Sequence, residues 1–206
     1  RPSQFIANQL FTYQSNYLLD NIKFSFNAGH FINNLKEYEG WTKPAFDLTI
    51  ESTQLMPNIR YHLHNLTFNV GAQISFLNNK NNIEDRLIPD ANSQGLGLYT
   101  IIDYEKNNFG FNSAFRYDYN SLIADKLDYD AEFSGASYSS GVYYTYSDNI
   151  FRLTYSSAFR SPHISELFSD GIHHGTNRYE IGNNNLKVLK KLMSYIYPLV
   201  GILHQF

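Results

Sequence analysis

The sequence contains no cysteine, no long hydrophobic run and no excess of basic residues. The lack of cysteine excludes disulfide scaffolds, thiolate metal sites and thiol catalysis. No window of about 18 apolar residues exists, which excludes a transmembrane helix. A net charge of −3, without a stripe of Lys and Arg, provides no field for nucleic acid. The features that remain to be explained are the strand-forming residues of the sequence.

Catalytic signatures are absent as well. The chain has no Gly-x-Ser-x-Gly elbow, no phosphate-binding glycine loop and no His-Glu-x-x-His pair. Glu37 and Glu39 form a pair of nearby carboxylates, but their neighbours are loop-like and give no sign of burial that would shift a pKa. We therefore expect no catalytic residues, no enzymatic activity and no cofactor.

Aromatic residues are abundant. They make up 17% of the 206 residues, with 17 Tyr and 16 Phe, and charged residues make up another 17%. Aromatic and β-branched side chains fit a pleated surface better than a helix. The composition predicts an all-β fold.

Apolar residues alternate with polar ones in several segments, most clearly in 66–76, 109–119 and 151–160. Alternation with a period of two is the pattern of a strand with two different faces. We predict strands at about 4–13, 21–36, 46–64, 67–79, 93–104, 109–119, 137–147 and 150–161, with a possible ninth from 179. The apolar faces of the three clearest segments carry Leu66, Phe68, Val70, Ala72, Ile74, Phe76, Phe109, Phe111, Phe115, Tyr117, Tyr119, Phe151, Leu153, Tyr155 and Phe159.

The connections between these strands alternate in length. Short polar turns are predicted at 64–65, 105–108 and 147–149, and longer polar loops near 37–45, 78–93, 120–135 and 161–179. Short turns on one rim and long loops on the other are typical of an outer-membrane β-barrel. Aromatic residues near strand ends fit the interfacial girdles of such barrels: Tyr13, Tyr104, Tyr119, Tyr146 and Phe159. A water-soluble aromatic-rich sheet would also alternate, so pattern alone leaves both open.

One segment resembles a known family. Residues 156–168 read SSAFRSPHISELF and residues 170–187 read DGIHHGTNRYEIGNNNLK. This succession is similar to that of TonB-dependent receptors, supported upstream by Leu87-Ile88-Pro89-Asp90, Gly95-Leu96-Gly97 and Phe115-Arg116-Tyr117-Asp118. The positions that carry the resemblance are Phe159, Arg160, Pro162, Glu166, Leu167, Phe168, Glu180, Gly182, Asn183 and Leu186.

The resemblance implies a part of an antiparallel transmembrane β-barrel of about 22 strands in the outer membrane. It also implies an imported solute, namely a metal ion or a metal complex such as a siderophore. The expected partners are outer-membrane lipid and a TonB-type energy coupler, which acts through a plug domain that we do not find in this sequence. Nucleic acid is not an expected partner.

The resemblance covers about residues 20–187, and we assign 1–187 to the barrel segment. The tail at 188–206, with Lys190-Lys191 and Pro198, has no clean alternation, and we expect it not to continue the barrel. A truncated or frame-disrupted reading would explain the tail.

The loop after residue 160 holds the candidate ligand-binding residues. Imidazole and carboxylate groups suit Zn²⁺ or a similar ion, and this loop combines His163, Glu166, Asp170, His173 and His174. An ordinary polar loop is the competing interpretation. Arg160 and Glu166 flank Pro162 and form either a salt bridge or two solvated charges.

Two functional alternatives stay open beside the receptor. One is a small closed barrel of eight strands with a structural or adhesive role. The other is a soluble binding sheet. Both would keep the alternating strands, and neither would require an energy coupler.

Overall fold

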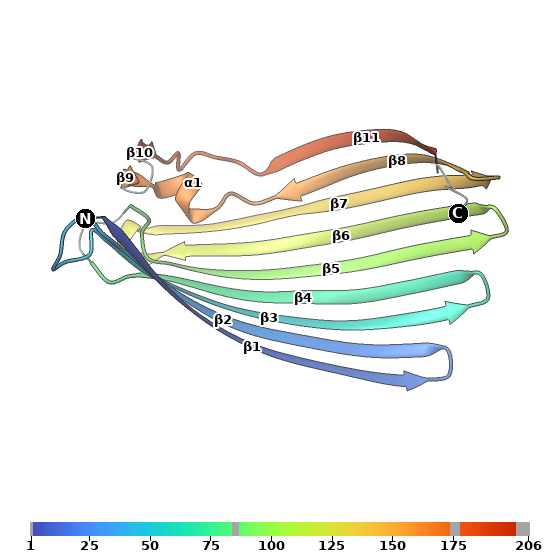
Figure 1. The fold of residues 1–206 in the computed structure, drawn as a ribbon, viewed down its shortest axis with the longest axis horizontal. Helices are drawn as coiled ribbons and strands as arrows, with labels where there is room; N and C mark the ends of the chain where they lie inside the picture. The colour runs from blue at the N-terminus through green and yellow to red at the C-terminus, as the bar shows by residue number, and fades with distance from the viewer. Residues whose placement is uncertain (1, 84–86, 174–177, 201–206) are drawn as a thin grey trace, which may run out of the picture.

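The structure of the chain is a computed structural model that describes residues 2–83, 87–173 and 178–200. Nine long strands form one antiparallel sheet in which neighbours in sequence are neighbours in space, β11 following β8 (Figure 1). The strands of this sheet are β1 Ser3–Leu19, β2 Ile22–Tyr38, β3 Phe46–Leu63, β4 Leu66–Asn81, β5 Ala91–Lys106, β6 Phe109–Ala124, β7 Tyr129–Tyr146, β8 Asn149–Arg160 and β11 Leu189–Val200.

Smaller elements gather at one end of the sheet. They are the 3-10 turn η1 at Asp125–Leu127, the short helix α1 at Ile164–Phe168, and the two-stranded sheet formed by β9 at Asp170–His173 and β10 at Arg178–Ile181. Among the described residues, no helix is both long and apolar enough to span a lipid bilayer. The prediction of an all-β fold is confirmed.

The sequence predicted the first eight strands at the right places, with several ends too short. Strands β6 and β7 extend through most of the predicted loop at 120–135, so that 125–128 alone separates them. The predicted ninth strand from 179 is wrong, because β10 pairs with β9 outside the main sheet. The ninth strand is instead β11, which pairs with β8 from Leu189↔Arg160 to Val200↔Asn149, although the tail was expected to leave the pattern.

Four two-residue turns join the strands at one rim: 20–21, 64–65, 107–108 and 147–148. The first residue of each has a positive φ between 48° and 54°, namely Asp20, His64, Asn107 and Ser147. Tight hairpins require positive φ, which Asn and Asp tolerate better than most residues. The opposite rim carries the long connections 39–45, 82–90 and 161–188. The predicted asymmetry between the two rims is confirmed for three of the four long loops. The fourth, predicted at 120–135, is a short connection at 125–128, and the turn at 20–21 is additional.

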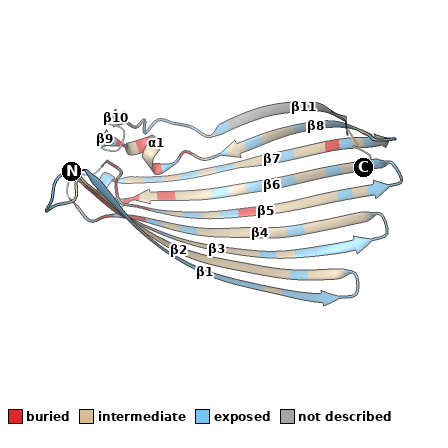
Figure 2. Cartoon of the chain, in the orientation of Figure 1, coloured by how far each residue is buried: buried red, intermediate tan, exposed pale blue. Residues whose placement is uncertain are grey.

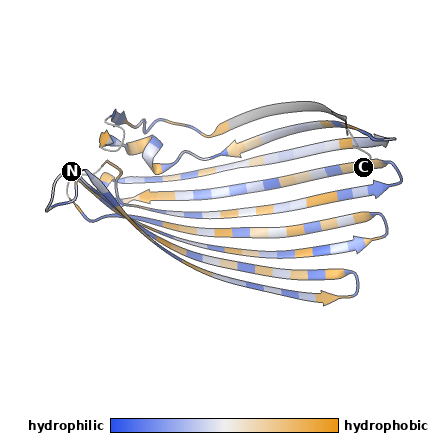
Figure 3. Ribbon diagram, viewed as in Figure 1, coloured by the Kyte–Doolittle hydropathy of each residue, from blue (hydrophilic) through white to orange (hydrophobic). Residues whose placement is uncertain are grey.

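The pairing register extends one apolar face across the sheet. Val70 on β4 pairs with Thr100 on β5, which pairs with Phe115 on β6, and Phe115 pairs with Tyr138 on β7. Apolar and polar residues alternate along most of these strands (Figure 3). The face holds large exposed side chains, among them Val70 at 55%, Leu98 at 53% and Leu153 at 51%. Such a large uncovered apolar surface requires a non-aqueous neighbour.

The apolar face ends sharply toward the long-loop rim. On β4 it runs from Leu66 to Phe76, after which Asn78 and Lys80 take the outward positions. At about 3.3 Å per residue this run spans about 33 Å along the strand, or about 25 Å of height at a tilt of about 40°. Outer-membrane barrels present an outward apolar band of about 25 Å. The band therefore has the dimensions of a bilayer core.

The opposite face is polar in its middle and apolar near the long-loop rim. Asn58 donates hydrogen bonds to Asn69 and to Tyr99, the latter at 3.1 Å, on three neighbouring strands. Nearer the long-loop rim, Ala91, Leu122 and Ala124 form a buried cluster with Ile164 and Leu167 of α1. Several of the buried segments lie close to α1 (Figure 2). Because α1 packs on this face, we take it as the inner face of the barrel wall.

We predict that Val70→Arg destabilises insertion into a bilayer, because it places a charge near the middle of the outward band. The expected cost is about 2–4 kcal/mol. Urea titration of the protein, produced at the length of its gene and folded into phospholipid vesicles, measures it. Gln73→Arg, on the inner face of the same strand, is the matched control and should change stability little. Equal costs for the two variants would contradict the assignment of the faces.

Candidate functional site

The site begins near the end of β8, where its pairing with β7 stops while its pairing with β11 continues to Arg160. Pairing between β7 and β8 ends at Tyr138↔Ser157, and the Phe159 backbone N–H then donates to Ser137 Oγ at 3.0 Å. The Phe159 ring lies against Gly135, so close that a Cβ there would overlap it. Gly135 shares the inner face with Ser137, so Phe159 does not continue the outward apolar row that the sequence assigned to it. The chain turns inward after β8 ends at Arg160.

Pro162 precedes α1, and His163 is its N-cap, with an extended backbone at φ −89° and ψ 153°. The imidazole Nδ1 accepts a hydrogen bond from the Ser165 N–H at 3.3 Å, and Glu166 Oε2 accepts one from the His163 N–H at 2.8 Å. This reciprocal arrangement is a capping box, which satisfies amide groups that a helix start leaves without partners. The spacing His-x-x-Glu replaces the usual Ser or Thr at the cap with an imidazole.

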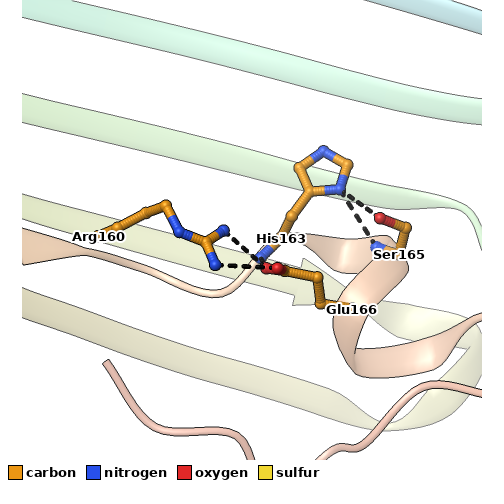
Figure 4. Close-up of polar contacts among 4 residues, drawn as sticks. All are labelled: Arg160, His163, Ser165 and Glu166. Carbon is orange, nitrogen blue, oxygen red and sulfur yellow. Dashed lines mark hydrogen bonds and ion pairs between the residues drawn. The ribbon is translucent and has the colours of Figure 1, made fainter. Parts of the chain in front are cut away.

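Arg160 and Glu166 form a bidentate ion pair across the turn, with Nη1 to Oε2 at 2.8 Å and Nη2 to Oε1 at 2.9 Å. The His163 ring points away from this pair (Figure 4). The predicted salt bridge is thus present in the structure. Hydrogen bonds from Arg160 and from the His163 amide lower the pKa of Glu166 from 4.5 to about 2, so that the carboxylate is ionised at any physiological pH.

Below α1, two side chains enter the inner face of the sheet. Ile164 and Leu167 are 3% and 2% exposed, and they contact the cluster of Ala91, Leu122 and Ala124. Phe168 packs edge-on against Tyr129, with ring centroids 4.7 Å apart. Burial of each large apolar side chain contributes about 1.5–3 kcal/mol. These contacts fold the long connection inward over the lumen side.

On the other side of α1, residues 182–183 pass along the α1 backbone and bond to it. The Gly182 N–H donates to the Ser169 carbonyl at 2.6 Å, and the Asn183 N–H donates to the Glu166 carbonyl at 2.8 Å. A Cβ on Gly182 would lie 2.6 Å from the Leu167 carbonyl oxygen. Glycine is therefore required at position 182 for close backbone approach.

The upstream sequence pieces also meet in space. Gly97 on β5 pairs with Asp118 on β6, and the Arg116 guanidinium occupies the space where a Gly97 side chain would be. Arg116 bonds Asp118 through Nε at 2.8 Å. Leu87 is 8% exposed and packs with Phe46 and Leu48, while its carbonyl accepts from the Asp170 N–H at 3.2 Å. The loop at 87–90 thus supports the start of β9.

The predicted ligand residues are only partly brought together. Glu166 is bound to Arg160, so a cation could use its carboxylate only by displacing the guanidinium. Asp170 Oδ1 accepts from the Tyr179 hydroxyl at 2.7 Å. His173 ends β9, and His174 lies outside the described residues. No group of three His, Asp or Glu residues within the described ranges has a geometry suited to a metal ion. Metal contact at this loop stays a prediction.

A cavity of about 250 Å³ lies between this segment and the inner wall. Sequence reasoning missed its wall residues, because single Asn and Ser residues on a polar strand face carry no distinctive pattern. The polar wall residues are Asn79, Ser93 and Asn120; the apolar ones are Leu77, Ala91, Leu122 and Phe133; and Arg160–Ile164 closes the cavity on the side of α1.

The nine-stranded antiparallel sheet, its outward apolar band and the inward-folded loop are features of a wall segment of an outer-membrane β-barrel. The family model "TonB dependent receptor-like, beta-barrel" matches residues 3–188. The chain therefore belongs to the TonB-dependent receptor family, and its location is the outer membrane. Comparison with curated proteins finds no match.

Among solved structures, the chain is similar to the FrpB iron transporter of Neisseria meningitidis, F5-1 variant, in its apoprotein form. The sequences are 16% identical, the TM-score is 0.60, and the match covers 77% of this chain. It covers 29% of the FrpB chain, so this chain spans less than a third of that protein. At this identity the likeness concerns the fold.

We predict that Gly182→Ala loosens the α1 segment, because the added methyl group overlaps the Leu167 backbone. Overpacking of this kind costs about 1–3 kcal/mol. Limited proteolysis of intact outer membranes should show faster cleavage within 161–187. Gly40→Ala is the matched control, since a Cβ there meets nothing within 4 Å. Identical cleavage patterns for the two variants would refute the steric role of Gly182.

The Glu166 ion pair gives the segment a pH dependence. The folded pKa of about 2 lies below the ordinary value of 4.5, so the stabilisation is complete above 4.5 and is lost as pH falls toward 2. Hydrogen exchange of residues 161–168 should be slower than in Glu166→Gln at about pH 6, and the difference should vanish near pH 2. A difference that persists at the lowest pH would show that ionisation of Glu166 is not its cause.

Proposed function

We propose that this chain forms wall and outward loops of a receptor that imports a scarce solute, a metal ion or a metal complex such as a siderophore, through the outer membrane. The observation that carries the proposal is the inward fold of α1 onto the inner face of the wall, at the level just beyond the outward apolar band. A loop in this position contacts a solute that enters the lumen. The wall meanwhile anchors the receptor in the bilayer.

The electrostatics of the inner surface support non-covalent capture. The Arg160 and Glu166 charges satisfy each other, and so do those of Arg116 and Asp118. Paired charges and amide side chains give the lumen hydrogen-bonding capacity without a strong net field. A solute can then bind and leave without crossing a large electrostatic barrier.

The likeness to a protein named as an iron transporter supports a metal-containing solute. Energy would come from a TonB-type coupler acting through a plug domain, as the family membership suggests. The coupler and the solute are both proposals for this chain. Catalysis forms no part of the proposed role.

We predict that deletion of the gene lowers uptake of the solute, and that deletion of the energy coupler lowers it equally, because import against a gradient needs the coupler. The measurement is accumulation of radiolabelled ferric citrate and zinc chloride by intact cells, with a strain restored by the gene as control. Uptake that needs the gene and not the coupler would overturn the energised mechanism.

A further inference from the structure

The cavity between α1 and the inner wall has a chemical character that suggests what it binds. Asn79 is 6% exposed, and it lines the cavity. The half-buried side chains of Ser93 and Asn120 line it as well. Hydrogen-bonding side chains on a cavity wall are a feature of a binding surface.

The remaining wall is apolar. Leu77, Leu122 and Phe133 line the cavity beside these polar groups. A small number of hydrogen-bonding groups set in an apolar wall is the usual composition of a site for an organic ligand. The side-chain amides each offer donors and an acceptor, and the Ser93 hydroxyl offers both. Ligand hydroxyl groups, which also donate and accept, complement this set.

The charged groups at the mouth are already engaged. Arg160 is paired with Glu166, and the His163 Nδ1 bonds Ser165. One imidazole nitrogen, Nε2 of His163, remains without a partner in the described part of the chain. A bare divalent cation needs several carboxylate, imidazole or thiolate ligands, which the cavity lining does not provide. A bare ion is therefore a poor match for this cavity.

We propose that the cavity under α1 binds a neutral, hydroxyl-rich organic group of about the size of a sugar ring. Asn79, Ser93 and Asn120 bond its hydroxyls, and Phe133 and Leu122 contact its apolar face. This inference rests on the proposed receptor function and names the chemistry that the receptor selects. If the imported solute is a metal complex, the cavity holds its organic part.

The chain contains no cysteine, so one introduced thiol reports on the cavity. The protein is produced at the length of its gene with Ser93→Cys, and labelling of the thiol by a membrane-impermeant maleimide is timed in outer membranes. The probes are glucose, maltose and sucrose as neutral polyols, ferric citrate as an anionic chelate, and zinc chloride as a bare cation. Ser139→Cys, half-buried on the same inner face outside the cavity, is the control.

At least one of the sugars should protect Cys at position 93. Sugar at about ten times its dissociation constant slows labelling by about tenfold, because it leaves about one site in eleven open. Adding Asn79→Ala to Ser93→Cys should abolish most of this protection, and labelling of Ser139→Cys should not change. Protection by zinc chloride alone, equal protection at both cysteines, or no protection by any sugar would overturn the proposal.

The two proposals fail separately. If sugar protects position 93 but uptake does not depend on the coupler, the cavity proposal is supported and the proposal of energised import is contradicted. If uptake depends on the coupler but no sugar protects position 93, energised import is supported and the cavity proposal is contradicted.

Discussion

The rest of the structure depends on one constraint: each strand must hide its backbone polar groups by pairing, while its two faces meet different surroundings. In hydrocarbon an unpaired N–H or C=O group costs several kcal/mol, so spanning strands must be paired on both sides. A period of two then assigns each side chain to lipid or to lumen. The register from β1 to β8 keeps this assignment constant over the whole sheet.

The long-loop rim adds a second layer to that wall. Strands rise beyond the apolar band. After β8 ends at Arg160, the chain turns inward, and Pro162 and the His163 cap direct α1 onto the wall. Two buried side chains, Ile164 and Leu167, fix it from below, and Gly182 allows the returning chain to bond its backbone from above. The family motif is therefore mainly a structural device that folds a loop over the lumen.

The sequence predicted what local alternation can encode. Strands such as β4 and β6 stand out because lipid selects apolar residues at every second position. It failed where that selection ends. Residues 120–124 and 129–135 are strands above the band, where Asp130, Glu132 and Ser134 face outward and the apolar side chains Tyr129, Ala131 and Phe133 face inward, the reverse of the pattern within the band. Phe159 was misplaced because a ladder ending at Ser157 cannot be read from composition. Five residues cannot sustain a helix alone, so α1 depends on tertiary contacts, and β11 depends on its pairing with β8.

The central claim is that one face of the sheet meets lipid and the other meets the lumen. Nitroxide labels placed one at a time along β4, from Leu66 to Lys80, test it through their collisions with oxygen, which partitions into lipid, and with a water-soluble nickel complex. The account predicts oxygen access at Phe68, Val70, Ala72, Ile74 and Phe76, low oxygen access at the residues between them, and a change to nickel access at Asn78. Access without a period of two, or nickel access throughout, would contradict it.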